Sequence, residues 1–300
     1  MNYGKAAMRR RAHEIDNKPT KIRKKCGVIF WKIFVVCIIV AGVVGISTGV
    51  GAVKGILASA PDISEIDVIP TGYSTTVLAS DGSEIATLVA EGSNRQYVTL
   101  DKISENLQHA VVAIEDERFY EHNGIDLKGI ARALVTDIKA MDFSQGASTI
   151  TQQLIKNNVL TEQWANENEG KISKLEKMER QVQRKIQEMY IAVELEKKVD
   201  DKDWILENYL NSINLGSNTL GVQAAAQRYF GKDVSELSLS ECAGIAGITK
   251  NPAGYNPILH PDKNAARRED VLDAMKQIEG ADDMTLEDLL GETLRVLGNN

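Results

Sequence analysis

The sequence predicts a mainly helical domain that follows a single membrane-spanning helix, with one short β-hairpin between them. Three observations support this fold class. An uncharged apolar run near the N-terminus is long enough to cross a bilayer, an Asp-Gly pair separates two β-branched runs, and apolar residues recur at helical spacing from Ile103 onward. The 300 residues, 43% of them apolar, suit one large domain or two small ones.

The apolar run at residues 33–53 is the predicted membrane span. It holds 21 residues without a charge, enough for a hydrocarbon core of about 30 Å. Residues 1–32 carry ten Lys or Arg against two acids, a net charge of +8. The positive-inside rule therefore places this basic segment in the cytoplasm and the chain after residue 54 outside the cell membrane. A cleaved signal peptide is the alternative; the long basic lead and the lack of a small-x-small cleavage site disfavour it.

Charge and cysteine content limit the possible partners and the possible sources of stability. The whole chain carries −7, so the part after residue 32 carries −15, which argues against a nucleic-acid partner. Cys26 and Cys37 lie at or in the membrane segment, which leaves Cys242 without a disulfide partner in the exported part. No His-rich or Cys-rich pattern indicates a metal cage. Stability must come from an ordinary core, in which Cys242 is expected to be packed.

Turn residues mark the remaining boundaries. Residues 60–72 contain two prolines and a glycine, and residues 54–74 are predicted to be a linker. Two β-branched runs, 75–79 and 84–89, flank Asp81-Gly82 and predict the hairpin. The domain itself is expected to span residues 75–278, with an acidic tail at 279–300.

An acid pair follows the first helical run. Glu115 and Asp116 come directly after five apolar residues, with Phe119 and His122 close behind. A carboxylate beside an apolar wall is poorly solvated, which suits a general acid or base. A helix end with solvated acids and a core phenylalanine explains the pattern equally well, so the motif alone decides nothing.

A second polar stretch, QGASTITQQLIKN, reads as a capped helix. Ser148 or Thr149 is a natural N-cap, and Ser148, Gln152 and Lys156 recur every four residues on one face. Free N–H groups, an amide and an ammonium on one stripe would suit a pyrophosphate with attached sugars. An ordinary capped surface helix is the alternative.

A third segment is a long amphipathic helix predicted from about Lys171 to Lys198. Arg184, Lys185 and Glu188 stand at the edge of its apolar stripe. An i,i+4 ion pair between Arg184 and Glu188 would be a routine surface feature. A functional role requires Glu188 to face the same cleft as Glu115. The later segments at 204–232 and 236–257 are interpreted as scaffold and cleft wall.

Five motifs in this order resemble the peptidoglycan glycosyltransferases, family 51 of the glycosyltransferases. They are EDERFYEHNG, GASTITQQLIKN, RKIQE, ILENYLNSINLG with YFGK, and ELSLSECAGIAG with NPAGYNP. The first two are the most specific, and the resemblance covers about residues 75–278. Members occur as monofunctional enzymes and as the first extracytoplasmic domain of class A penicillin-binding proteins.

The resemblance implies a lysozyme-like fold and an enzyme that joins lipid II into glycan strands, releasing undecaprenyl pyrophosphate. Glu115 would deprotonate the acceptor 4-hydroxyl, and Glu188 would assist near the leaving diphosphate. The substrate contacts implied by the family pattern are Asp116, Phe119, His122, Ser148, Thr149, Gln152, Lys156, Arg184 and Lys185. It also implies a divalent metal, Mg²⁺ or Mn²⁺, and no organic cofactor. The expected partners are lipid II, the growing lipid-linked strand, the membrane and other cell-wall synthesis proteins.

Two departures qualify the resemblance. A charged segment between Asn157 and Arg184 is longer than in the family, and neither Ser-x-x-Lys nor Lys-Thr-Gly occurs, so no transpeptidase is expected in this chain.

Two other functions stay open: a lytic transglycosylase or muramidase, and a non-catalytic scaffold for wall precursors. The resemblance also implies a smaller lobe that lies against the membrane. Its apolar residues are expected to contact the outer leaflet: Met141, Phe143, Val159, Leu160 and Trp164.

Overall fold

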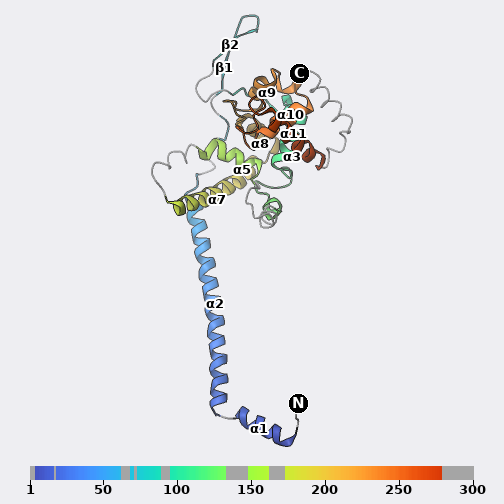
Figure 1. Ribbon diagram of the computed structural model, residues 1–300. Coiled ribbons are helices and arrows are strands. Elements are labelled where there is room, and N and C mark those ends of the chain that lie inside the picture. The colour runs from blue at the N-terminus through green and yellow to red at the C-terminus, as the bar shows by residue number, and fades with distance from the viewer. Residues whose placement is uncertain are drawn as a thin grey trace. The chain divides into compact units, whose positions relative to one another are not determined.

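The computed structural model describes residues 4–16, 18–61, 68–70, 73–88, 95–132, 148–161 and 173–278. The chain divides into two compact units, Met1–Ser59 and Ala60–Asn300, and each is described by itself (Figure 1). The predicted acidic tail at 279–300 lies outside the described residues. The predicted domain limits within the chain stay predictions.

The first unit consists of two helices, α1 (Lys5–Asp16) and α2 (Lys18–Ala58). The predicted span at 33–53 lies within α2. Over Lys25–Ala58, a stretch of 34 residues, α2 is long and apolar enough to cross a membrane by length and composition. Its large apolar side chains are exposed, as expected of a helix whose partner is lipid.

The second unit is mainly helical, which confirms the predicted fold class. It begins with the predicted hairpin, in which β1 (Thr75–Leu78) pairs antiparallel with β2 (Glu84–Leu88). The helices that follow in the described residues are η1 (Leu100–Lys102), α3 (Glu105–Glu115), α5 (Ile150–Ile155), η2 (Lys156–Leu160), α7 (Lys174–Val199), α8 (Lys202–Ser212), α9 (Val222–Phe230), η3 (Val234–Glu236), α10 (Leu239–Ile248) and α11 (Pro261–Lys276).

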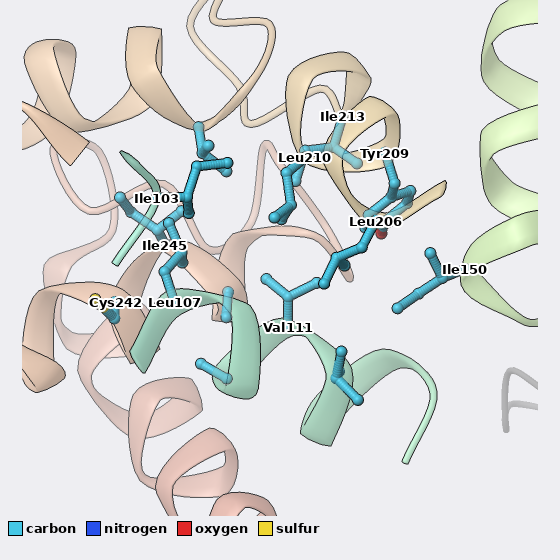
Figure 2. Packing of buried hydrophobic residues seen from close by; sticks show 14 of the residues in the cluster. Ile103, Leu107, Val111, Ile150, Leu206, Tyr209, Leu210, Ile213, Cys242 and Ile245 are labelled. Carbon is cyan, nitrogen blue, oxygen red and sulfur yellow. The ribbon is translucent and has the colours of Figure 1, made fainter. Parts of the chain in front are cut away.

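Helix α3 lies at the centre of the core and packs on α10 and α11. Two of its apolar residues are fully buried beside fully buried residues of α8 and α10, and Figure 2 shows these side chains together: Leu107, Val111, Leu206, Leu210, Cys242 and Ile245. Burying each leucine contributes roughly 1.5–3 kcal/mol. This packing fixes the direction of α3 and therefore the position of Glu115, its last residue. The prediction that Cys242 is a packed core residue is confirmed.

The apolar stripe predicted along the long helix is only partly buried. Helix α7 begins after Ser173, whose side chain forms a capping box with Glu176. Leu175, Met178 and Val182, which belong to this stripe by their spacing, are exposed. The buried residues of α7 begin at Gln187, because α7 packs on α5 through its second half. The periodicity therefore located the helix correctly and overestimated its buried length.

Two of the apolar residues expected at the membrane are described, and one of them contradicts the expectation. Leu160 is fully buried in the core, and Val159 is half-buried against it. A leucine that the core already covers has no apolar surface left for lipid. Met141, Phe143 and Trp164 lie outside the described residues.

Glu241 stabilises the first turn of α10 through its side-chain contacts. Its side chain closes a capping box with Ser238, and both its oxygens lie 2.8 Å from Lys232 Nζ. Burial raises the pKa of Glu241, but Lys232 and the Ser238 N–H outweigh burial, so the pKa is lowered overall. A lowered folded-state pKa stabilises the fold above the unfolded-state pKa, and this contribution disappears as pH falls through the folded-state pKa.

Glu241→Gln is therefore expected to destabilise the fold at pH 7 by about 0.5–1 kcal/mol, because Lys232 is partly exposed and glutamine keeps the capping box. Urea unfolding at pH 7, 5 and 3 should show the difference from wild type shrinking as pH falls. Glu236→Gln, at an exposed residue in η3, is the control. A difference that stays constant with pH would show that the charge of Glu241 contributes nothing.

Candidate active site

Glu115 ends α3 and is hydrogen-bonded to two side chains, one from α5 and one from the C-cap of α10. Its Oε2 accepts a hydrogen bond of 2.7 Å from Gln153 Nε2, and its Oε1 is hydrogen-bonded to the hydroxyl of Thr249. The Tyr209 hydroxyl donates to Gln153 Oε1 at 3.1 Å. Burial, and then the charges of Glu115 and Asp116, raise the pKa of Tyr209 well above its usual value, so this hydroxyl stays protonated. We call Glu115, Gln153, Tyr209 and Thr249 the base cluster.

Asp116 points into the protein rather than to solvent. Both its oxygens lie near His122 Nε2, at 2.9 and 3.0 Å, and Oδ2 also accepts the Ile150 N–H at 3.0 Å. Phe119 is fully buried, with its ring edge toward His122 and Lys202 Nζ 4.5 Å from the ring centre. Asp116, Phe119 and His122 are three of the predicted substrate contacts. In this structure their internal contacts stabilise the loop that follows α3.

The first turn of α5 differs from the predicted phosphate site. Thr149 is the N-cap; its hydroxyl accepts from the Gln152 N–H at 3.2 Å and donates to the Gly124 carbonyl at 2.8 Å. The Ile150 N–H is bonded to Asp116. These two N–H groups are therefore already satisfied by the protein, because a carboxylate and a hydroxyl at a helix N-terminus are favourable partners for them.

Lys185 gathers four predicted residues into one polar group. Its ammonium donates to Ser148 Oγ at 2.7 Å, Gln152 Oε1 at 2.9 Å and Glu188 Oε1 at 2.5 Å. The Glu188 side chain is 6% exposed and that of Lys185 41% exposed. We call Ser148, Gln152, Lys185 and Glu188 the cation cluster. The charges of Lys185 and Glu188 cancel, and three acceptors occupy the three donors of the ammonium.

The predicted stripe ends after Gln152. Lys156 is exposed, and among the described residues its ammonium has no hydrogen bond or ion pair. It is the first residue of η2, a π-helical segment, whose wider turn breaks the four-residue repeat. Arg184 is half-buried on α7, next to Lys185.

Glu115 and Glu188 are linked through α5. Gln153 binds Glu115, whereas its neighbour Gln152 belongs to the cation cluster with Glu188. The structure thus places both predicted catalytic carboxylates around one short helix, each with different partners. A base beside a cationic group is the arrangement required to remove a proton at one point and stabilise a leaving anion at another.

Comparison with known proteins places the chain in a family. The family profile described as Transglycosylase matches residues 81–276. The chain belongs to this family. Penicillin-binding protein 1A/1B of Bacillus subtilis (strain 168) is 38% identical over 262 residues, which cover 87% of this chain and 26% of that protein. Penicillin-binding protein 1A of Aquifex aeolicus (strain VF5) is 46% identical over 181 residues, 60% of this chain and 23% of that protein.

The resemblance to peptidoglycan glycosyltransferases is thereby confirmed at the level of the family. The chain spans about a quarter of the length of these two relatives. A crystal structure of penicillin-binding protein 1A from Haemophilus influenzae covers 74% of this chain and 20% of that chain at 22% identity, with a TM-score of 0.37. That similarity is too low to bear on the fold.

The described part of the transglycosylase domain does not fit a metal held by protein ligands alone. No group of three or more His, Cys, Asp or Glu side chains lies together among these residues. Asp116 is bonded to His122 and Ile150, and Glu188 to Lys185. The divalent ion stays a prediction from family resemblance.

Three residues of the base cluster were missing from the sequence analysis. Gln153 stands beside the predicted Gln152, and the GASTITQQ motif contains both. Tyr209 and Thr249 lie in segments interpreted as scaffold, on α8 and directly after α10. Nothing local distinguishes them, because their partners are distant in the chain: Gln153 is 56 residues from Tyr209, and Glu115 is 134 residues from Thr249.

Proposed function

We propose that this chain polymerises lipid II into glycan strands and releases undecaprenyl pyrophosphate. The observation that supports this most is Glu115, a carboxylate hydrogen-bonded to Gln153 and Thr249, at the position that the family pattern assigns to the base. The cation cluster on the other side of α5 supplies groups suited to a diphosphate.

The proposed step balances as one displacement. The 4-hydroxyl of the acceptor sugar gives its proton to Glu115 while its oxygen bonds to C1 of the donor sugar. The bond between C1 and the diphosphate oxygen breaks, and its electron pair leaves with the diphosphate. General-base catalysis of this kind contributes typically 10²–10⁴-fold.

The cation cluster would act on the leaving group. Lys185 must exchange at least one of its three present acceptors to contact a diphosphate. Ser148 and Gln152 are the neutral acceptors, so they are the ones we propose the diphosphate oxygens replace. Glu188 would then keep the ammonium in position, and Lys156 and Arg184 would add positive charge.

We also propose that α2 anchors the enzyme in the cell membrane, with residues 1–32 cytoplasmic and the transglycosylase domain outside. The support is the length of the apolar helix and the +8 charge before it. A protease added outside intact cells should degrade the domain and spare an N-terminal epitope tag. Protection of the domain would reverse the orientation.

The decisive test is incubation of the detergent-extracted protein with labelled lipid II. Polymer that lysozyme digests is the expected product. A lytic transglycosylase would leave lipid II unchanged and cut preformed strands, and a scaffold would bind lipid II without turnover. Either result would overturn the proposed function.

A further inference from the structure

Thr249 stands out because its hydroxyl lies between two acceptors. The residue follows α10 as its C-cap and is half-buried. Its Oγ1 is hydrogen-bonded to Glu115 Oε1 and also lies 2.7 Å from the Ala246 carbonyl oxygen. Both neighbours are acceptors when Glu115 is ionised.

A threonine hydroxyl has one hydrogen and two lone pairs. With Glu115 ionised, the hydrogen points to the carboxylate, since a charge-assisted hydrogen bond is the stronger one. With Glu115 protonated, the carboxyl O–H donates to Thr249 Oγ1, and the threonine hydrogen turns to the Ala246 carbonyl. The bond between Glu115 and Thr249 survives in both states, and only one hydrogen rotates.

The other contact of Glu115 lacks this property. Gln153 reaches Oε2 through its Nε2, which only donates, and its carbonyl oxygen is occupied by Tyr209. Gln153 therefore orients the ionised carboxylate and cannot accept a proton from it. Of the two side chains bonded to Glu115 among the described residues, only the hydroxyl can serve both protonation states.

We propose that Thr249 is a positioning residue whose hydroxyl holds Glu115 in one place while the carboxylate gains and loses its proton. The inference rests on the proposed role of Glu115 as the base. In each turnover the proton from the acceptor hydroxyl settles on Glu115, with Thr249 as acceptor. It then leaves to water, after which Thr249 donates again.

The consequence is an effect on rate rather than on substrate binding. Without the hydroxyl, Oε1 loses its partner in both states, and the carboxylate is free to rotate away from the acceptor. Misplacement of a reacting group lowers kcat, whereas lipid II binding depends on other contacts, so KM should change little.

The test compares three variants in the lipid II polymerisation assay. Thr249→Val keeps the shape and removes the hydroxyl, and Thr249→Ser keeps the hydroxyl. Thr161→Val is the matched control, because the exposed Thr161 hydroxyl also donates to a backbone carbonyl, that of Lys156, and has no carboxylate partner among the described residues. We expect Thr249→Val to lower kcat about ten- to a hundredfold with KM within about threefold and unchanged thermal stability. Thr249→Ser and Thr161→Val should stay within about threefold of wild type.

Three results would overturn the proposal. A Thr249→Val variant within twofold of wild type would show that the hydroxyl has no role. Equal losses in the valine and serine variants would show that side-chain shape, not the hydroxyl, matters. A loss of kcat matched by a loss of folded protein would show that Thr249 only caps α10. A wild-type chain that makes no polymer would instead refute the proposed function, and this inference with it.

Discussion

Glu115→Gln is expected to lower the rate of lipid II polymerisation by a factor on the order of 10²–10⁴ while the fold stays intact. Glutamine has the shape of glutamate but cannot take a proton from the acceptor hydroxyl. Its contacts can be kept: the amide oxygen accepts from Gln153, and the amide nitrogen donates to Thr249, whose hydrogen then turns to Ala246. The variant therefore separates chemistry from structure.

Initial rates and lipid II binding measured on the same preparation would check this. Binding should weaken far less than the rate. Glu121→Gln is the matched control, since Glu121 lies in the same loop and its side chain is 65% exposed. Near-normal polymerisation by folded Glu115→Gln protein would remove Glu115 from the mechanism.

Most of the fold followed from periodicity and turn chemistry. The hairpin around Asp81-Gly82 and the long helix α7 were located from sequence within a few residues, and the predicted span at 33–53 lies inside the longer helix α2. The exposure of the first half of α7 was not predicted, because a helical repeat shows which residues share a face and not whether another element covers that face.

The site could be predicted where its residues lie in one contiguous motif. It could not be predicted where its contacts join residues that are distant in sequence. Ser148, Gln152, Lys185 and Glu188 were all singled out, but their convergence on one ammonium depends on α5 packing against α7. The phosphate-binding helix end was interpreted from local capping alone. Asp116, 34 residues away in sequence, takes one of its N–H groups, and no local pattern reveals that.

Lys185→Ala should have the second-largest effect, a loss of donor use by about 10²–10³-fold. The substitution removes the ammonium that we propose to meet the diphosphate. It also leaves Glu188, 6% exposed, without its ion-pair partner, which destabilises the fold. A single variant therefore confuses loss of catalysis with loss of stability.

The double variant Lys185→Ala with Glu188→Gln separates these effects, because no unpaired buried charge remains. We expect thermal stability to recover toward wild type, while donor use and binding of a phosphoglycolipid inhibitor of the moenomycin type stay impaired.

Lys156→Ala and Arg184→Ala should impair the same two properties. Lys177→Ala, at an exposed residue in the same helix as Lys185, should impair neither. If the double variant regains full activity, Lys185 serves only to neutralise Glu188; if Lys177→Ala behaves like the others, bulk positive charge rather than the cation cluster attracts the donor.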